Sequence, residues 1–67
     1  MPVIKTIDVV GVSTESWGDA AKQALAEAAK TIRAIERMDI LGTSAVIRDG
    51  TIAEYHTHVQ ISFRLER

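Results

Sequence analysis

Residues 51–65, TIAEYHTHVQISFRL, alternate between two kinds of side chain, and this alternation constrains the fold more than any other feature of the chain. The odd-numbered positions carry mostly apolar or aromatic residues, while the even-numbered positions carry mostly polar ones. Such a period of two indicates a half-buried β-strand, because successive side chains of a strand point to opposite faces. We therefore expect one strand here that is much longer than the usual length of about five or six residues.

A second β-rich segment precedes this strand and is separated from it by Asp49 and Gly50. The pair Asp-Gly predicts a two-residue hairpin turn, because both residues tolerate the positive φ that such a turn requires. Continued without interruption, the register set by this turn pairs Arg48 with Thr51, Thr43 with His56, and Leu41 with His58.

The first half of the chain is predicted to form a strand and then a helix. Residues 3–10 are rich in β-branched side chains and are followed by a predicted turn over residues 11–15. Ser16 is a good helix N-cap, and the carboxylate of Asp19 can reach back to it in a capping box. From Trp17 onward the apolar period lies between three and four, which predicts an amphipathic helix. Its apolar stripe consists of Trp17, Ala21, Ala24, Leu25, Ala28, Ile32 and Ile35.

These elements predict an α+β fold, in which residues 1–67 form a single domain. A three-stranded antiparallel sheet curls around one amphipathic helix in the order β-α-β-β. A chain of 67 residues builds only a marginal core, and without cysteine it cannot add disulfides. Because 46% of its residues are nevertheless apolar, and because a long strand leaves pairing edges exposed, we expect several copies to associate.

Charge and hydropathy argue against several other classes of partner and activity. A formal net charge of -1 offers no basic surface for nucleic acid or a membrane. No apolar run approaches the roughly 20 residues that span a bilayer. The first residues do not resemble a signal peptide, so a cytoplasmic location is expected. The sequence has no nucleophile–base spacing and no phosphate-binding glycine loop, so we expect a binding protein rather than an enzyme.

Glu54, His56 and His58 form a row of possible metal ligands on the polar face of the last strand. Same-face neighbours along a strand lie roughly 6.5–7 Å apart, so two of them chelate one ion only if their side chains bend together. The alternative is that this row is a solvated face or a subunit interface, which is the commoner use of such residues. The sequence leaves both interpretations open.

The segments VIKTIDVVGVSTESWGDAAKQAL and VQISFRLER, together with the Asp-Gly hairpin, resemble the dodecins. Dodecins are small β-α-β-β proteins that assemble as hollow shells of twelve identical subunits. The resemblance covers essentially the whole chain, and residues 11–14 and 62–66 are its most specific parts. It implies a homododecamer that binds, stores or buffers a small molecule, with a flavin such as FMN or riboflavin as the ligand.

The resemblance also implies where the flavin lies. It rests against a tryptophan in a Trp-Phe segment at the start of the second strand, and a glutamine of the third strand contacts it. Arg37 and Met38 stand at the first two positions and His56 at the third. Losing an aromatic platform weakens stacking by on the order of 1–3 kcal/mol, by analogy with base stacking. We therefore place the chain in the branch that lacks this tryptophan, where a divalent cation such as calcium is implicated for some members.

The alternative function is thus a flavin-free shell that is structural or binds calcium. Arg37 itself is expected to form an ion pair rather than to stack on a ligand. Its candidate partners are Glu36, Asp39, Glu66 and Asp8 of neighbouring subunits. Arg64 and Glu66 are expected to form interface salt bridges, and Trp17 is interpreted as a plug at the start of the helix in preference to a ligand platform.

Overall fold

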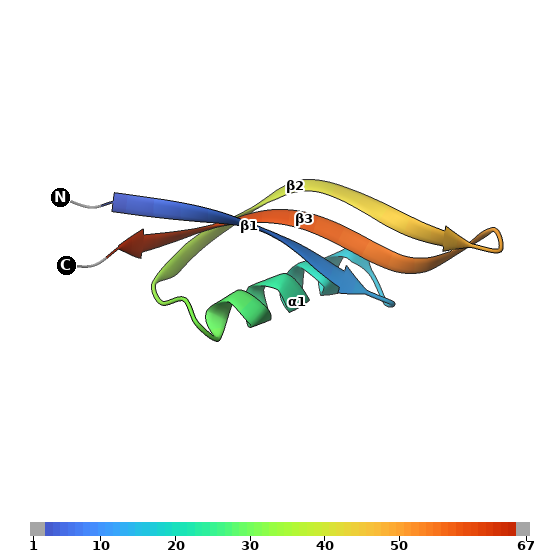
Figure 1. The fold of residues 1–67 in the computed structure, drawn as a ribbon, viewed down its shortest axis with the longest axis horizontal. Coiled ribbons are helices and arrows are strands. Elements are labelled where there is room, and N and C mark those ends of the chain that lie inside the picture. Colours follow the sequence, from blue (N-terminus) through green and yellow to red (C-terminus); the bar gives the residue numbers. More distant parts are fainter. Residues whose placement is uncertain (1–2, 66–67) are drawn as a thin grey trace.

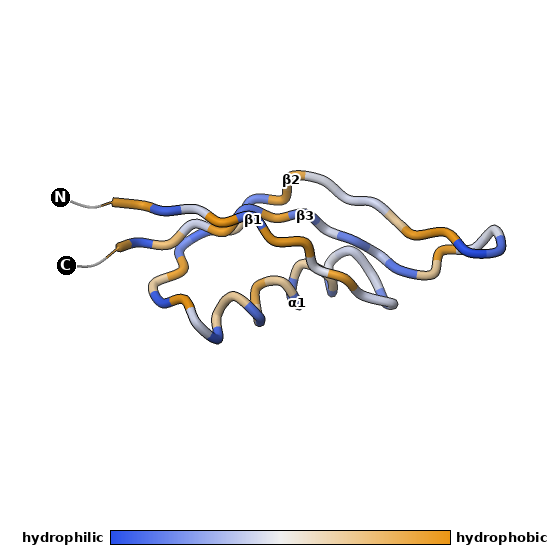
Figure 2. The backbone as a smooth tube through the Cα atoms, in the orientation of Figure 1, coloured by the Kyte–Doolittle hydropathy of each residue, from blue (hydrophilic) through white to orange (hydrophobic). Residues whose placement is uncertain are grey.

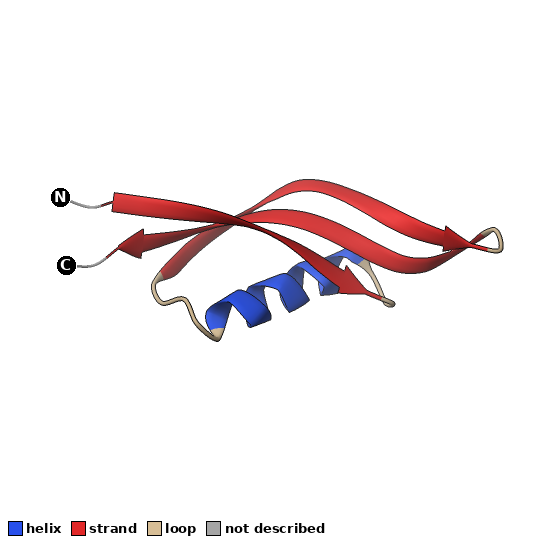
Figure 3. Ribbon diagram, viewed as in Figure 1, coloured by secondary structure: helices blue, strands red, loops and turns tan. Residues whose placement is uncertain are grey.

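The structure, a computed structural model, describes residues 3–65. Its elements are β1 (Val3–Ser13), α1 (Trp17–Ala29), β2 (Ile35–Arg48) and β3 (Thr51–Leu65). The strands form one antiparallel sheet in the order β1-β3-β2, so the last strand lies in the middle. α1 lies against one face of this sheet (Figure 1, Figure 3). The predicted α+β fold and its β-α-β-β order are confirmed.

The two faces of the sheet have different roles. The side chains that contact α1 alternate along each strand with side chains that point to the other side. We call this other side the helix-free face. It carries Ile4, Thr6, Asp8 and Val10 of β1, Arg37 and Asp39 of β2, and His56, His58, Gln60, Ser62 and Arg64 of β3. Most of the polar residues of β3 therefore lie on this face, as the alternation predicts.

β1 continues through Gly11, so the turn predicted for residues 11–15 begins too early. Gly11 pairs with Thr57 in the β1–β3 ladder. A Cβ atom at Gly11 would lie 1.8 Å from the carbonyl oxygen of Ala20, which is far inside van der Waals contact. The glycine is thus required by the close approach of α1 to the strand, and it does not mark the end of the strand.

The N-cap of α1 is confirmed, because Ser16 Oγ accepts a hydrogen bond from the amide of Asp19 at 3.0 Å. The carboxylate of Asp19 takes a different partner from the one predicted. It accepts a hydrogen bond from Ser13 Oγ at 2.6 Å. This contact ties the end of β1 to the first turn of the helix.

α1 ends at Ala29, so the predicted apolar stripe is wrong at its last two members. Ile32 lies in the loop after the helix and Ile35 is the first residue of β2. The chain turns at Ala34, whose φ of 61° belongs to the left-handed region and cannot continue a right-handed helix. Both isoleucines still pack against the core, which explains why they follow the apolar pattern.

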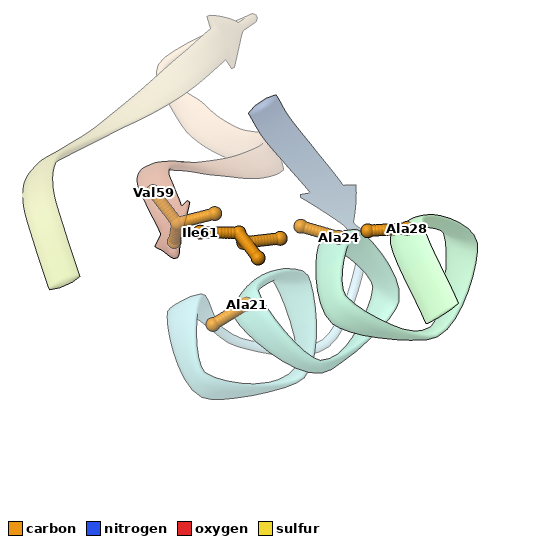
Figure 4. Close-up of a cluster of buried hydrophobic side chains, with 5 residues drawn as sticks. All are labelled: Ala21, Ala24, Ala28, Val59 and Ile61. Atoms are coloured by element: carbon orange, nitrogen blue, oxygen red, sulfur yellow. The ribbon is translucent and has the colours of Figure 1, made fainter. Parts of the chain in front are cut away.

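The core is small and lies between α1 and the middle of the sheet. Figure 4 shows the buried cluster of Ala21, Ala24, Ala28, Val59 and Ile61. Val59 and Ile61 are completely buried. Alanine on the inner face of the helix lets the backbone of α1 approach the sheet closely, in agreement with the tight contact at Gly11.

The hairpin turn is confirmed, with φ of 52° at Asp49 and 75° at Gly50. Arg48 pairs with Thr51 as predicted, but the register then shifts by one residue, because Ala53 has no partner on β2. The predicted pairs of both histidines are therefore wrong, since His56 lies opposite Ser44 and His58 opposite Gly42. A second bulge, which leaves Leu41 unpaired, restores the original register from Ile40 and Val59 to Arg37 and Ser62, and a third shift follows between Arg37 and Ile35.

The chain is elongated, with extents of 52 × 19 × 12 Å and a radius of gyration of 13.8 Å. A compact chain of this length has a radius of gyration of about 11 Å. Figure 1 shows both ends of the sheet reaching past the helix, and Figure 2 shows hydrophobic segments on both strands next to the polar hairpin turn. α1, the helix found within residues 3–65, is too short and too polar to cross a membrane.

Candidate functional site

Arg37 lies near the start of β2, opposite Ser62 and on the helix-free face. Its side chain is 72% exposed, and its Nε lies 3.4 Å from Oδ2 of Asp39. Asp39 was one of the predicted acidic partners of Arg37. The prediction placed it in a neighbouring subunit, whereas this ion pair forms within one chain. Arg37 also borders a shallow hollow of about 260 Å³ with Ile4, Glu36 and Ser62.

Met38 points to the opposite side of β2. It pairs with Ile61 and packs against the core cluster. On this side a second hollow, of about 390 Å³, is lined by Leu25, Ala29, Ile35, Glu36, Arg37 and Met38. The start of β2 therefore has a hollow on each face, and Arg37 borders both. Arg37 and Met38 do not present their side chains to one common face.

His56 lies far from both of these residues. It is opposite Ser44, and its Nε2 is 3.1 Å from Oε1 of Glu54. Six positions of β3 separate His56 from Ser62, the partner of Arg37, which corresponds to roughly 20 Å along a strand. One chain therefore does not bring Arg37 and His56 together. A single ligand that contacts both would have to lie between two copies.

His58 has a partner that the sequence did not indicate. Its Nε2 lies 3.4 Å from Oδ2 of Asp8, and Oδ1 of Asp8 accepts a hydrogen bond from Gln60 Nε2 at 3.4 Å. The predicted row thus divides into the pairs Glu54 with His56 and Asp8 with His58. Within residues 3–65, no three His, Cys, Asp or Glu side chains gather around one possible ion. The three side chains of the row therefore do not gather within one chain, and Asp8 of β1 lies beside His58 instead.

Asp8 and Gln60 were missed as site residues for a specific reason. Both fall on even-numbered positions, as do the histidines, so the alternation places them on the polar faces of their strands. Their proximity depends on β1 pairing with β3, and the order of the strands has no signal in the sequence.

Trp17 joins the beginning of α1 to the sheet. Its Nε1 donates a hydrogen bond to the carbonyl of Ser44 at 2.8 Å, and its indole meets the ring of Tyr55 edge to face at 4.8 Å between centroids. Thr57 Oγ1 donates to the carbonyl of Trp17 at 2.8 Å. These contacts fasten Trp17 to the sheet, but 39% of the residue stays exposed in the single chain, so it is not a buried plug there. They also place it at the opposite end of α1 from Arg37.

Arg64 of β3 forms a salt bridge with Glu36 near the start of β2. Its Nε lies 3.0 Å from one carboxylate oxygen of Glu36, and a second guanidinium nitrogen lies 3.4 Å from the other. The salt bridge expected of Arg64 at an interface therefore has a partner within the same chain. The second residue of that prediction, Glu66, lies outside the described residues.

Comparison with known proteins gives a consistent result. A sequence model of the dodecin family matches residues 3–66. A dodecin from Thermus thermophilus is 33% identical over 64 residues, which cover 96% of this chain and 93% of the relative. The crystal structure of an arginine-to-alanine variant of the Thermus thermophilus dodecin superimposes with a TM-score of 0.95 at 31% identity, and covers both chains completely.

Similarity extends to a dodecin that binds a metal ion. The calcium dodecin of Mycobacterium tuberculosis, a calcium-chelating antigen with a novel calcium-binding site, has a TM-score of 0.85 at 25% identity. The match covers 96% of this chain and 91% of that one. Proteins with closely similar folds thus include one whose described ligand is calcium.

Proposed function

The chain belongs to the dodecin family, and on this basis we propose that twelve copies assemble as a hollow shell that binds a small planar molecule between subunits. Each copy contributes residues 1–67 as one domain. The role is binding and storage rather than catalysis. A flavin is the ligand that family membership suggests, with weakened stacking because Arg37 stands where the family has tryptophan.

The separation of Arg37 from His56 is the observation that carries this proposal. The two positions lie roughly 20 Å apart in one chain, and Arg37 borders an open hollow. A ligand held by both needs surfaces from two copies, so binding depends on assembly. The half-exposed apolar side chains of the sheet supply the surface for association. The most exposed are Ile4, Val10, Ile40, Leu41 and Ile47, at 51–58%.

Arg37 also affects the choice of ligand. If two copies meet at a two-fold axis beside this residue, two guanidinium groups approach each other. Asp39, 3.4 Å from Arg37, offsets only part of that charge in each copy. An anionic ligand such as FMN relieves the repulsion, whereas neutral riboflavin does not. We therefore expect FMN to bind more tightly than riboflavin.

Substitution of Arg37 tests the ligand proposal. Arg37→Trp should strengthen riboflavin binding about ten- to hundredfold, because one stacking contact contributes roughly 1–3 kcal/mol and about 1.4 kcal/mol is a factor of ten. Adding His56→Gln should improve it further. Quenching of riboflavin fluorescence measures both effects.

Arg48→Trp is the matched control, because it adds the same aromatic ring at the other end of β2. It should leave the titration unchanged. If wild type and all variants give the same titration curve, the position of Arg37 does not face the ligand and the small-molecule proposal fails. Light scattering tests assembly separately, with an expected mass near twelve times 7.3 kDa. A stable monomer at micromolar concentration would contradict it.

The second candidate is a shell that is structural or binds calcium and takes up no flavin. Two observations favour it: the non-aromatic Arg37 at the stacking position, and the similarity to a calcium dodecin. Protein that purifies yellow supports the flavin shell. Colourless protein that leaves riboflavin fluorescence unchanged but binds Ca²⁺ in equilibrium dialysis supports the second candidate.

A further inference from the structure

We propose that Asp8 and His58 form a binding site for a divalent transition-metal ion of the Zn²⁺ class on the helix-free face. The proposal rests on a carboxylate of β1 and an imidazole of β3 that meet diagonally on adjacent strands, since Asp8 pairs with Gln60 and His58 with Val10. It does not depend on flavin binding, and it names a different ion and a different donor set from a calcium site.

The distance between the two donor atoms is the first argument. His58 Nε2 and Asp8 Oδ2 are 3.4 Å apart. In a tetrahedral zinc site with Zn–N and Zn–O bonds of about 2.0–2.2 Å, two ligand atoms lie about 3.3–3.5 Å apart. A charge-assisted hydrogen bond between the same groups would bring them to about 2.7–2.9 Å. The observed ion-pair separation therefore also matches the spacing of two ligands of one ion.

The support around Asp8 is the second argument. Gln60 Nε2 donates to Oδ1 of Asp8 at 3.4 Å, while Oδ2 is the oxygen that faces His58. Asp8 and Gln60 are cross-strand partners, so the ladder itself holds them side by side. Carboxylates that bind metals are typically oriented in this way by a hydrogen bond to the oxygen that does not bind the ion.

Access to the site is the third argument. The side chains of Asp8 and His58 are 55% and 44% exposed. The residue opposite His58 on β2 is Gly42, and no atom lies within 4 Å of the position that its Cβ would occupy. An ion held by Asp8 and His58 therefore keeps positions open for water or for a donor from another copy.

The donor set determines the class of ion. Imidazole nitrogen with carboxylate oxygen suits Zn²⁺, Co²⁺ and Ni²⁺, whereas Ca²⁺ takes six to eight oxygen ligands. The other carboxylate–imidazole pair, within β3, is less suitable. Glu54 and His56 are 3.1 Å apart and hydrogen-bonded, and their side chains are only 34% and 30% exposed. This pair provides an internal control.

Calorimetric titration of the full chain with Zn²⁺ tests the site, with the protein assembled as purified and free of any histidine tag. Asp8→Asn and His58→Gln should each weaken Zn²⁺ binding by at least about tenfold, because each removes one of two protein ligands. Glu54→Gln should change it less than about twofold. Visible absorption of bound Co²⁺ should fall in the same two variants, and light scattering checks that each variant still assembles.

Three results would overturn the proposal. The wild-type protein could show no saturable binding of Zn²⁺. Glu54→Gln could weaken binding as much as Asp8→Asn, which would indicate chelation by the histidine row. Ca²⁺ could displace Zn²⁺ at equal concentration, which would indicate an oxygen-only site. None of these results bears on the flavin titrations, so failure of this site is distinguishable from failure of the small-molecule shell.

Discussion

The covered middle of the sheet and its hairpin arm share strands β2 and β3 but differ in how they are stabilised. In the middle, β3 lies between two strands and beneath α1, and Val59 and Ile61 are completely buried. The ladder between β1 and β3 ends at Ser13 and Tyr55. Residues 46–54, the hairpin arm, therefore form a two-stranded ribbon, in which Ile47 and Ile52 are 58% and 45% exposed.

This difference shows which part of the fold one chain can stabilise by itself. An isolated two-stranded hairpin is marginally stable at best in water. The arm is long, twisted by a bulge at Ala53, and apolar close to its tip. We infer that the middle of the sheet provides the stability of the single chain, whereas the arm becomes stable when other copies cover its apolar side chains.

The largest expected effect is in the covered middle. Gly11→Ala should lower the free energy of unfolding by more than about 3 kcal/mol, because the new Cβ would lie 1.8 Å from the carbonyl oxygen of Ala20 and would push α1 off the sheet. Gly42→Ala is the control, since its Cβ would meet nothing within 4 Å. Thermal unfolding followed by circular dichroism measures both, and equal melting temperatures would contradict the close packing of α1 on β1.

A pair of isoleucine substitutions compares the two regions directly. Ile61→Ala should cost about 2–3 kcal/mol, because it leaves a cavity in the core. Ile52→Ser, on the half-exposed arm, should change helix content little but should reduce assembly, seen as a lower mass in light scattering and a stronger dependence of unfolding on protein concentration. If Ile52→Ser leaves the assembled mass unchanged even at low protein concentration, the arm is not a contact between copies.

The smallest effect concerns the turn at the tip of the arm. Gly50→Val should cost about 1 kcal/mol or slightly more, because a β-branched residue is strained at a φ of 75°. Gly50→Asn, which tolerates this region, should cost less. Denaturant unfolding distinguishes the two variants. Gly50→Val should lower the assembled mass before it lowers the helix content. If its stability is unchanged, the turn is not needed to align the strands.

The sequence by itself determined the features that depend on neighbouring residues along the chain. The alternation of residues 51–65 identified the long strand and its polar face, and Asp49 with Gly50 identified the turn, because both patterns reflect local backbone geometry. The cap at Ser16 was equally local. The order β-α-β-β followed from these same elements, and the family resemblance added the twelve-subunit assembly and the positions of a possible ligand.

The tertiary structure decided which distant residues meet. The order β1-β3-β2 places Asp8 beside His58, and the unpaired Ala53 moves both histidines one step from their predicted partners. The sequence predicts the end of a strand at Gly11. In the structure the strand continues, and Gly11 is where the backbone of α1 comes closest to the sheet. Strand order and bulges depend on many weak contacts between residues that are distant in the sequence. Short sequence patterns therefore do not indicate them. The same reason applies to Arg37 and His56, which were predicted to contact one ligand. They lie at distant positions along the sheet, so one ligand could contact both only between two copies.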